Sequence, residues 1–121
     1  MTQQELTDRL LEFGINVLSM TERMINTPES NALRAQIVRS ATAPALLYGE
    51  ACAAESPQDF VHKMSIGLKE LRETKMSLTV VARKNYAPNM PLTELLDENE
   101  QLIRIFGRSV NTVRQKHLRK R

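Results

Sequence analysis

The sequence predicts an all-α protein folded as an antiparallel four-helix bundle with up-down-up-down topology. Apolar residues recur at alternating spacings of three and four along most of the chain, which is the pattern of helices with one buried face. Capping residues and prolines divide this pattern into four long segments with short links, and short links make successive helices antiparallel neighbours. Only 4 glycines and no tryptophan occur among 121 residues, which disfavours an all-β fold with many tight turns.

The first helix is predicted over Thr2–Asn26. Threonine caps helix starts and proline suits the first turn, so Thr27 and Pro28 are expected to end this helix and begin the next. Its buried stripe is expected to consist of Leu6, Leu10, Phe13, Val17, Met20 and Met24.

The second helix is predicted to run from Pro28 to about Glu55. It is rich in alanine, and small side chains let a neighbouring helix approach closely. Pro44 lies well inside it and removes the hydrogen bond to the carbonyl of Ser40, which predicts a kink. Its inner face is expected to consist of Leu33, Ile37, Ala41, Leu47 and Ala51.

The third helix has the clearest start in the chain. Ser56 can cap it, Pro57 suits its first position, and Asp59 favours its positive end. No breaker follows before Tyr86, and about 30 helical residues at ~1.5 Å each give a rod of ~45 Å. Its inward face is expected to consist of Phe60, Met64, Leu68, Leu71, Leu78 and Val81.

The fourth helix is predicted from about Leu92, after a segment with two prolines, Pro88 and Pro91. Asn99 interrupts its apolar stripe, and a single polar residue there is more often a register or packing device than a ligand. The other members of the stripe are Leu95, Leu102, Phe106, Val110 and Val113.

Antiparallel pairing of the second and third helices places residues at one level when their numbers add to about 111. Arg39 then lies level with Arg72–Glu73, and Glu50 lies near Val61–His62. We therefore predict an ion pair between Arg39 and Glu73 across the two helices. Its expected role is to fix helix register rather than to perform chemistry.

The charge divides the chain into a bundle, residues 1–113, and a basic C-terminal tail, residues 114–121. The net charge is +3, yet 1–113 holds 12 basic and 14 acidic residues. The tail has no acidic residue, and its five cations are candidate nucleic-acid contacts. The structural alternative is a solvated helix end whose cations suit the negative end of the helix dipole. These cations are Arg114, Lys116, Arg119, Lys120 and Arg121.

Other features exclude several function classes. The single cysteine, Cys52, excludes an internal disulfide, fits a reducing compartment and is expected to be a small packing residue. No apolar run reaches the ~20 residues of a membrane span and the start lacks a signal-peptide layout, so we expect a cytoplasmic protein. Asp59 and His62 form only half of a di-metal motif, and no phosphate-binding glycine loop occurs. We expect no metal, cofactor, small-molecule substrate or enzymatic activity.

Residues 36–42, Glu50 and residues 56–74 resemble the bacterial four-helix-bundle family named for proteins encoded in intervening sequences of 23S ribosomal RNA genes. The similarity covers about residues 6–113 and is most specific between Leu33 and Leu78. The sequence departs from the family pattern at residues 44–49. The motif residues that it keeps, with an expected structural or interface role, are Arg39, Ser40, Glu50, Asp59, Phe60, Arg72, Glu73 and Thr74.

This resemblance implies a bundle that assembles into a ring-shaped homo-oligomer, typically a pentamer, with no enzymatic activity. A related branch serves as an accessory protein to reverse transcriptases of diversity-generating retroelements, where a basic surface contacts nucleic acid. The expected partners are therefore further copies of the chain, and RNA, DNA or a reverse-transcriptase-like protein.

Two functions remain open at this point. The first is a non-catalytic oligomeric module that binds nucleic acid or a ribonucleoprotein through its basic surface and tail. The second is a protein-interaction scaffold without a nucleic-acid role, with Met20, Met24 or Met76 at its docking face. The structural alternative for these methionines is a place in the core or in a subunit interface.

Overall fold

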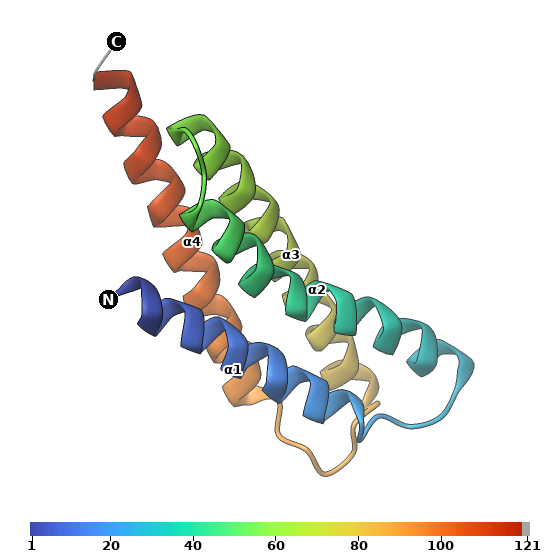
Figure 1. Cartoon of the computed structure of the whole chain (residues 1–121). Helices are drawn as coiled ribbons and strands as arrows, with labels where there is room; N and C mark the ends of the chain where they lie inside the picture. Colours follow the sequence, from blue (N-terminus) through green and yellow to red (C-terminus); the bar gives the residue numbers. More distant parts are fainter. Residues whose placement is uncertain (120–121) are drawn as a thin grey trace.

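The computed structural model describes residues 1–119, except for the Arg119 side chain, and forms a four-helix bundle (Figure 1). The helices are α1 (Gln3–Thr21), α2 (Pro28–Cys52), α3 (Pro57–Lys84) and α4 (Thr93–Arg119). No strand occurs within the described range, so the all-α prediction is confirmed. In residues 1–119, no helix is both long enough and apolar enough to cross a membrane.

The predicted helix starts are confirmed by their hydrogen bonds. The backbone N–H of Ser30 donates to the Thr27 hydroxyl at 3.2 Å, and the N–H of Asp59 donates to the Ser56 hydroxyl at 3.0 Å. Thr2 begins α1 in the same way, in a capping box with Glu5. Each start therefore follows from local chemistry that the sequence already contains.

The predicted end of the first helix at Asn26 is wrong, because α1 ends at Thr21. The guanidinium of Arg34, on α2, donates to the backbone carbonyls of Thr21 at 3.0 Å and Met24 at 2.9 Å. These carbonyls therefore do not need another helical turn to be satisfied. The chain folds back in a tight turn, so Met24 still reaches the core although it is no longer helical.

The second helix also ends earlier than predicted, at Cys52 rather than near Glu55. The third helix ends at Lys84, directly before the segment from Asn85 to Pro91 that was expected to stop it. Asn85 adopts a left-handed conformation, with φ of 53°, and its N–H bonds back to the carbonyls of the last turn. Helix α2 continues through Pro44 as one α-helix.

The core contains most of the residues that the apolar stripes predicted. All six members of the α1 stripe are buried, including Met20 and Met24, so these two methionines are core residues. Met76 is 70% exposed. Leu33, Leu47, Leu68 and Val113, at the edges of the predicted stripes, are only half-buried.

Close packing between α3 and α4 depends on Gly67. A Cβ atom at this position would lie 2.6 Å from Cε2 of Phe106 and 3.7 Å from Leu47 Cβ on α2. Phe106 is fully buried, so its ring has no free space into which it can move. Glycine at position 67 therefore lets three helices meet at one level.

The position of α4 along α3 depends on Asn99, the polar residue that interrupts the apolar stripe of α4. Asn99 is fully buried, and its amide Nδ2 donates to the backbone carbonyl of Leu71 on α3 at 3.0 Å. This bond forms at only one relative height of α3 and α4. Asn99 therefore contributes to the register, which is the role that the sequence predicted.

We predict that Gly67→Ala destabilises the protein by roughly 1–3 kcal/mol, because overpacking against Phe106 exceeds the gain of about 1 kcal/mol from alanine helix propensity. The matched control is Gly107→Ala in α4, where an added Cβ has no neighbour within 4 Å and stability is expected to rise. Urea unfolding of both variants measures the difference. Equal stabilisation by the two substitutions would contradict the close contact.

Candidate functional site

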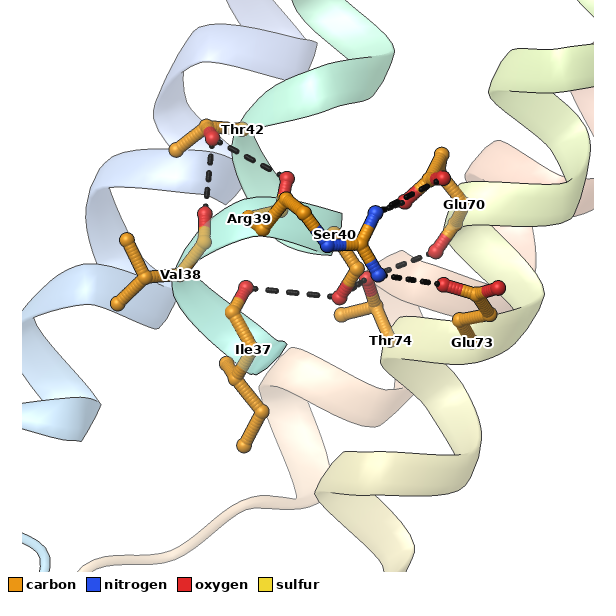
Figure 2. A network of polar contacts seen from close by, with 8 residues as sticks. All are labelled: Ile37, Val38, Arg39, Ser40, Thr42, Glu70, Glu73 and Thr74. Carbon is orange, nitrogen blue, oxygen red and sulfur yellow. Dashed lines mark hydrogen bonds and ion pairs between the residues drawn. The ribbon is translucent and has the colours of Figure 1, made fainter. Parts of the chain in front are cut away.

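The predicted Arg39–Glu73 ion pair is present, at 3.1 Å, and it belongs to a larger network on the α2–α3 surface (Figure 2). Arg39 also contacts Glu70, at 3.0 Å, so one guanidinium bridges two carboxylates of α3. The hydrogen bonds to Glu73 and Glu70 raise the pKa of Arg39, and the bond to Glu73 has the larger effect. Arg39 therefore stays charged and is unsuited to proton transfer.

Two buried hydroxyls lie beneath this ion-pair network. The side-chain oxygens of Ser40 and Thr74 are hydrogen-bonded at 2.9 Å, and Thr74 also donates to the carbonyl of Glu70 at 2.9 Å (Figure 2). Both residues are almost fully buried. Each hydroxyl therefore has a partner that only the correct pairing of α2 with α3 supplies.

The outer side of this network borders an open groove of about 560 Å³ between α2 and α3. Two further cations, Lys69 and Arg72, line it together with Arg39, and Glu73 and the exposed Met76 lie in the same groove. Arg72 thus faces solvent beside the network. Most residues that line the groove are of polar type, and three of them are cations.

The remaining family-motif residues lie at the other end of the α2–α3 pair. Glu50 is exposed and lies 3.9 Å from Lys63, one residue beyond its predicted neighbours Val61–His62. Asp59 belongs to the first turn of α3, and Phe60 is half-buried against the core. The structure therefore does not gather the eight motif residues into one site.

The C-terminal cations continue an α-helix. Helix α4 runs on to Arg119, and Arg114 and Lys116 are exposed on it. The Arg119 side chain, Lys120 and Arg121 lie outside the described residues.

The positive charge on α4 begins before the predicted tail. Arg104 and Arg108 are exposed on the same helix, and the chain has no acidic residue after Glu100. These two arginines were not among the predicted contacts, because the basic segment was taken to begin at residue 114. The absence of Asp and Glu over residues 101–121 was the available signal.

The expectation that Cys52 is a small packing residue is wrong. Its side chain is exposed rather than packed, and it lies one helical turn from the buried Tyr48. Burial, together with the neighbouring Cys52 thiol, raises the pKa of Tyr48 to about 12. The Tyr48 ring packs against Phe106 with a centroid distance of 6.1 Å, which joins α2 to α4.

Metal chemistry has no obvious centre in the described part of the chain. No group of three or more His, Cys, Asp or Glu side chains in that part is arranged to hold a metal ion. His62 is exposed, and His117 lies near the end of α4 beside Val113 and Leu118. The polar arrangements that the structure does contain are ion pairs and hydroxyl contacts between helices.

Comparison with known proteins identifies the family. A family model described as 23S rRNA-intervening sequence protein matches residues 3–108. The chain belongs to this family. The resemblance that residues 33–78 carry is therefore confirmed. The family's description names no activity.

A solved structure supports the fold of this family member. It is a protein of unknown function from the S23 ribosomal protein family of Bacteroides thetaiotaomicron VPI-5482, with a TM-score of 0.81 and 24% identity. The similarity covers 92% of this chain and 99% of that one. At this level of identity the likeness shows the fold alone. No curated protein matches the chain.

We predict that Arg39→Met leaves this family member folded and costs at most about 1 kcal/mol, because exposed ion pairs contribute little. Thr74→Val is expected to cost roughly 1–3 kcal/mol, since the buried Ser40 hydroxyl loses its partner on α3 and keeps only the 3.5 Å contact with the Ile37 carbonyl. Denaturant unfolding measures both. Thr79→Val is the control, because that hydroxyl bonds only to Lys75 of its own helix. A larger loss of stability from Arg39→Met than from Thr74→Val would contradict this prediction.

We also predict a stability change at high pH that depends on Tyr48. Its pKa is raised on folding from 10.0 to about 12, so the folded state holds this proton more tightly than the unfolded state. The contribution is fully present below pH 10 and is lost as the pH rises towards 12. The free energy of unfolding should therefore fall more steeply over this range in the wild type than in Tyr48→Phe. Parallel pH profiles for the two proteins would show that Tyr48 titrates normally.

Proposed function

We propose that this protein is a non-catalytic nucleic-acid-binding module that acts in the cytoplasm as a ring-shaped homo-oligomer of antiparallel, up-down-up-down bundles. The observation that carries the nucleic-acid role is the charge of α4. From residue 101 to 121 the chain has seven Lys and Arg residues and no acidic residue. The cations of this segment with described side chains, Arg104, Arg108, Arg114 and Lys116, are all exposed. Such a segment attracts phosphates and releases their counterions.

Self-association is supported by a second surface, on α1 and α2. Leu11 and Ile15 of α1 are 49% and 55% exposed, and Val38 and Leu46 of α2 are 38% and 72% exposed. A Cβ added at Gly14 would lie 3.3 Å from the carbonyl of Ala41, so the two helices are in close contact between these side chains. Several exposed apolar side chains on neighbouring helices are typical of an interface. The family resemblance favours a pentamer.

An oligomer would multiply weak phosphate contacts. Each copy contributes one basic α4, so contacts that are weak in one subunit add up by avidity when several subunits engage one nucleic acid. A ribonucleoprotein or a reverse-transcriptase-like complex would present the same phosphates. The polar α2–α3 network has a structural role in this proposal, because its charges are largely paired with one another.

We predict salt-dependent binding to RNA or DNA that depends on the C-terminal cations. The tail variant replaces Arg114, Lys116, Arg119, Lys120 and Arg121 with glutamine, and the control variant replaces Arg83 and Lys84, in the last turn of α3, in the same way. Each lost phosphate contact should reduce the slope of log K against log salt by about 0.7–0.9. Fluorescence anisotropy over a salt series gives the slope, and light scattering gives the mass. Binding that is unaffected in the tail variant would remove the proposal, and a monomer would remove its oligomeric part.

The alternative is a protein-interaction scaffold, and a specific observation favours its location. Met76 is 70% exposed in the groove beside Arg39, where a partner could bury it. This alternative predicts a stoichiometric protein complex that survives nuclease treatment and is weakened by Met76→Lys. Loss of the complex on nuclease treatment would favour the nucleic-acid module instead.

A further inference from the structure

One face of α4 carries side chains of the types that can form hydrogen bonds with base pairs. This face lies directly opposite the buried face of the same helix. At 100° per residue, Arg104, Arg108, Asn111, Thr112 and Gln115 fall within about one-third of the helix circumference. All five side chains are exposed. The buried residues of α4, such as Leu102, Phe106 and Val110, occupy the other side. We refer to the five exposed residues as the α4 outer face.

The chemistry of the α4 outer face differs from that of an ordinary solvated helix. Surface helices usually alternate acidic and basic residues, but no acidic residue occurs here. Arginine pairs with the O6 and N7 atoms of guanine, and asparagine and glutamine pair with the N6 and N7 atoms of adenine. The face therefore offers the donors and acceptors that distinguish base pairs in the major groove of DNA.

Two further cations flank this face. Arg114 and Lys116 project from opposite sides of it, because they lie 200° apart around the helix. A helix seated in the major groove has a phosphate backbone on each side. The flanking cations therefore stand where phosphate contacts would fix the position of the helix without reading sequence.

The two arginines of the face are only weakly engaged within the protein. Arg104 lies 3.5 Å from Glu100, and Arg108 donates to the Arg104 carbonyl of its own helix at 3.4 Å. Among the described residues, Arg108 has no carboxylate within 4.0 Å. Both guanidinium groups can therefore turn towards a ligand at little cost in lost contacts.

The α4 outer face is also not covered by α1. Arg9 of α1 contacts Glu98 and Gln101, and Figure 1 shows the N-terminal end of α1 beside the middle of α4. From Arg104 onwards the outer face is left uncovered by the other helices. The stretch from Arg104 to Gln115 is ~16 Å long, and an α-helix of ~10–12 Å diameter fits a B-DNA major groove about 12 Å wide.

A contact with DNA cannot extend into the N-terminal half of α4. It carries four acidic residues, Glu94, Asp97, Glu98 and Glu100, within seven positions. Asp97 faces the same side as the outer face and is exposed. Phosphates would be repelled there, so only the half beginning at Arg104 can approach DNA.

Resting on the proposed function, we infer that the α4 outer face is a recognition surface for the major groove of double-stranded DNA. Duplex RNA fits less well, because its major groove is deep and narrow and side chains do not read it. Single strands also fit less well, because residues 101–121 offer little for bases to stack on: Phe106 is fully buried and His117 is half-buried.

The test compares three probes on the full-length protein at one low salt concentration. These are a fluorescein-labelled 24-base-pair DNA duplex, the RNA duplex of the same sequence, and the single DNA strand. We expect the DNA duplex to bind at least tenfold more tightly than either of the others. Equal affinities, or preference for RNA or the single strand, would overturn the inference while leaving the proposed nucleic-acid role intact. Absence of binding to all three would remove both.

Variants locate the contact. Arg104→Gln with Arg108→Gln should weaken binding to the DNA duplex about tenfold or more, whereas the Arg83→Gln, Lys84→Gln control should change it less than twofold. Asn111→Ala with Gln115→Ala should reduce the preference for particular sequences in selection from a randomised duplex pool, with little loss of affinity for the unselected pool. All these residues are exposed, and circular dichroism checks the fold. An Arg104, Arg108 double variant that binds like the control would overturn the inference.

Discussion

The buried hydroxyl pair of Ser40 and Thr74 is the contact on which the arrangement of the helices depends. The 2.9 Å bond between the two hydroxyls would be lost if α2 slid along α3 by even one turn, and each buried hydroxyl would keep only a carbonyl of its own helix. The exposed ion pairs of Arg39 are satisfied at the same register, so the outer network and the buried pair select one alignment. With α2 and α3 aligned, the other helices have a fixed surface on which to pack.

The fourth helix takes its place from two contacts near this level. Asn99 bonds to the carbonyl of Leu71, and the Phe106 ring fills the space left by Gly67. The first of these contacts is directional and the second is steric, so they fix height and distance independently. The outer side of α4 packs against no other helix, so its residues are free to bind a ligand.

The charged residues that hold the helices together are therefore different from those that are proposed to bind nucleic acid. Arg39, the cation of the α2–α3 network, has two carboxylate partners within the bundle, whereas the C-terminal half of α4 concentrates cations without acidic residues. A net charge of only +3 conceals this separation, because all 14 acidic residues lie before Gln101. Long-range attraction of phosphates depends on the local field rather than on the net charge.

The sequence by itself determined the number of helices, their starts, most of the core and the Arg39–Glu73 contact. These follow from local capping and from apolar periodicity, which a single chain displays directly. It did not reveal the end of α1, because Arg34 satisfies those carbonyls from another helix. Only the tertiary structure added Glu70 to the Arg39 network and showed that the side chains of Cys52, Arg104 and Arg108 are exposed. Each of these depends on which side chains a neighbouring helix covers, and that is settled only when the helices pack.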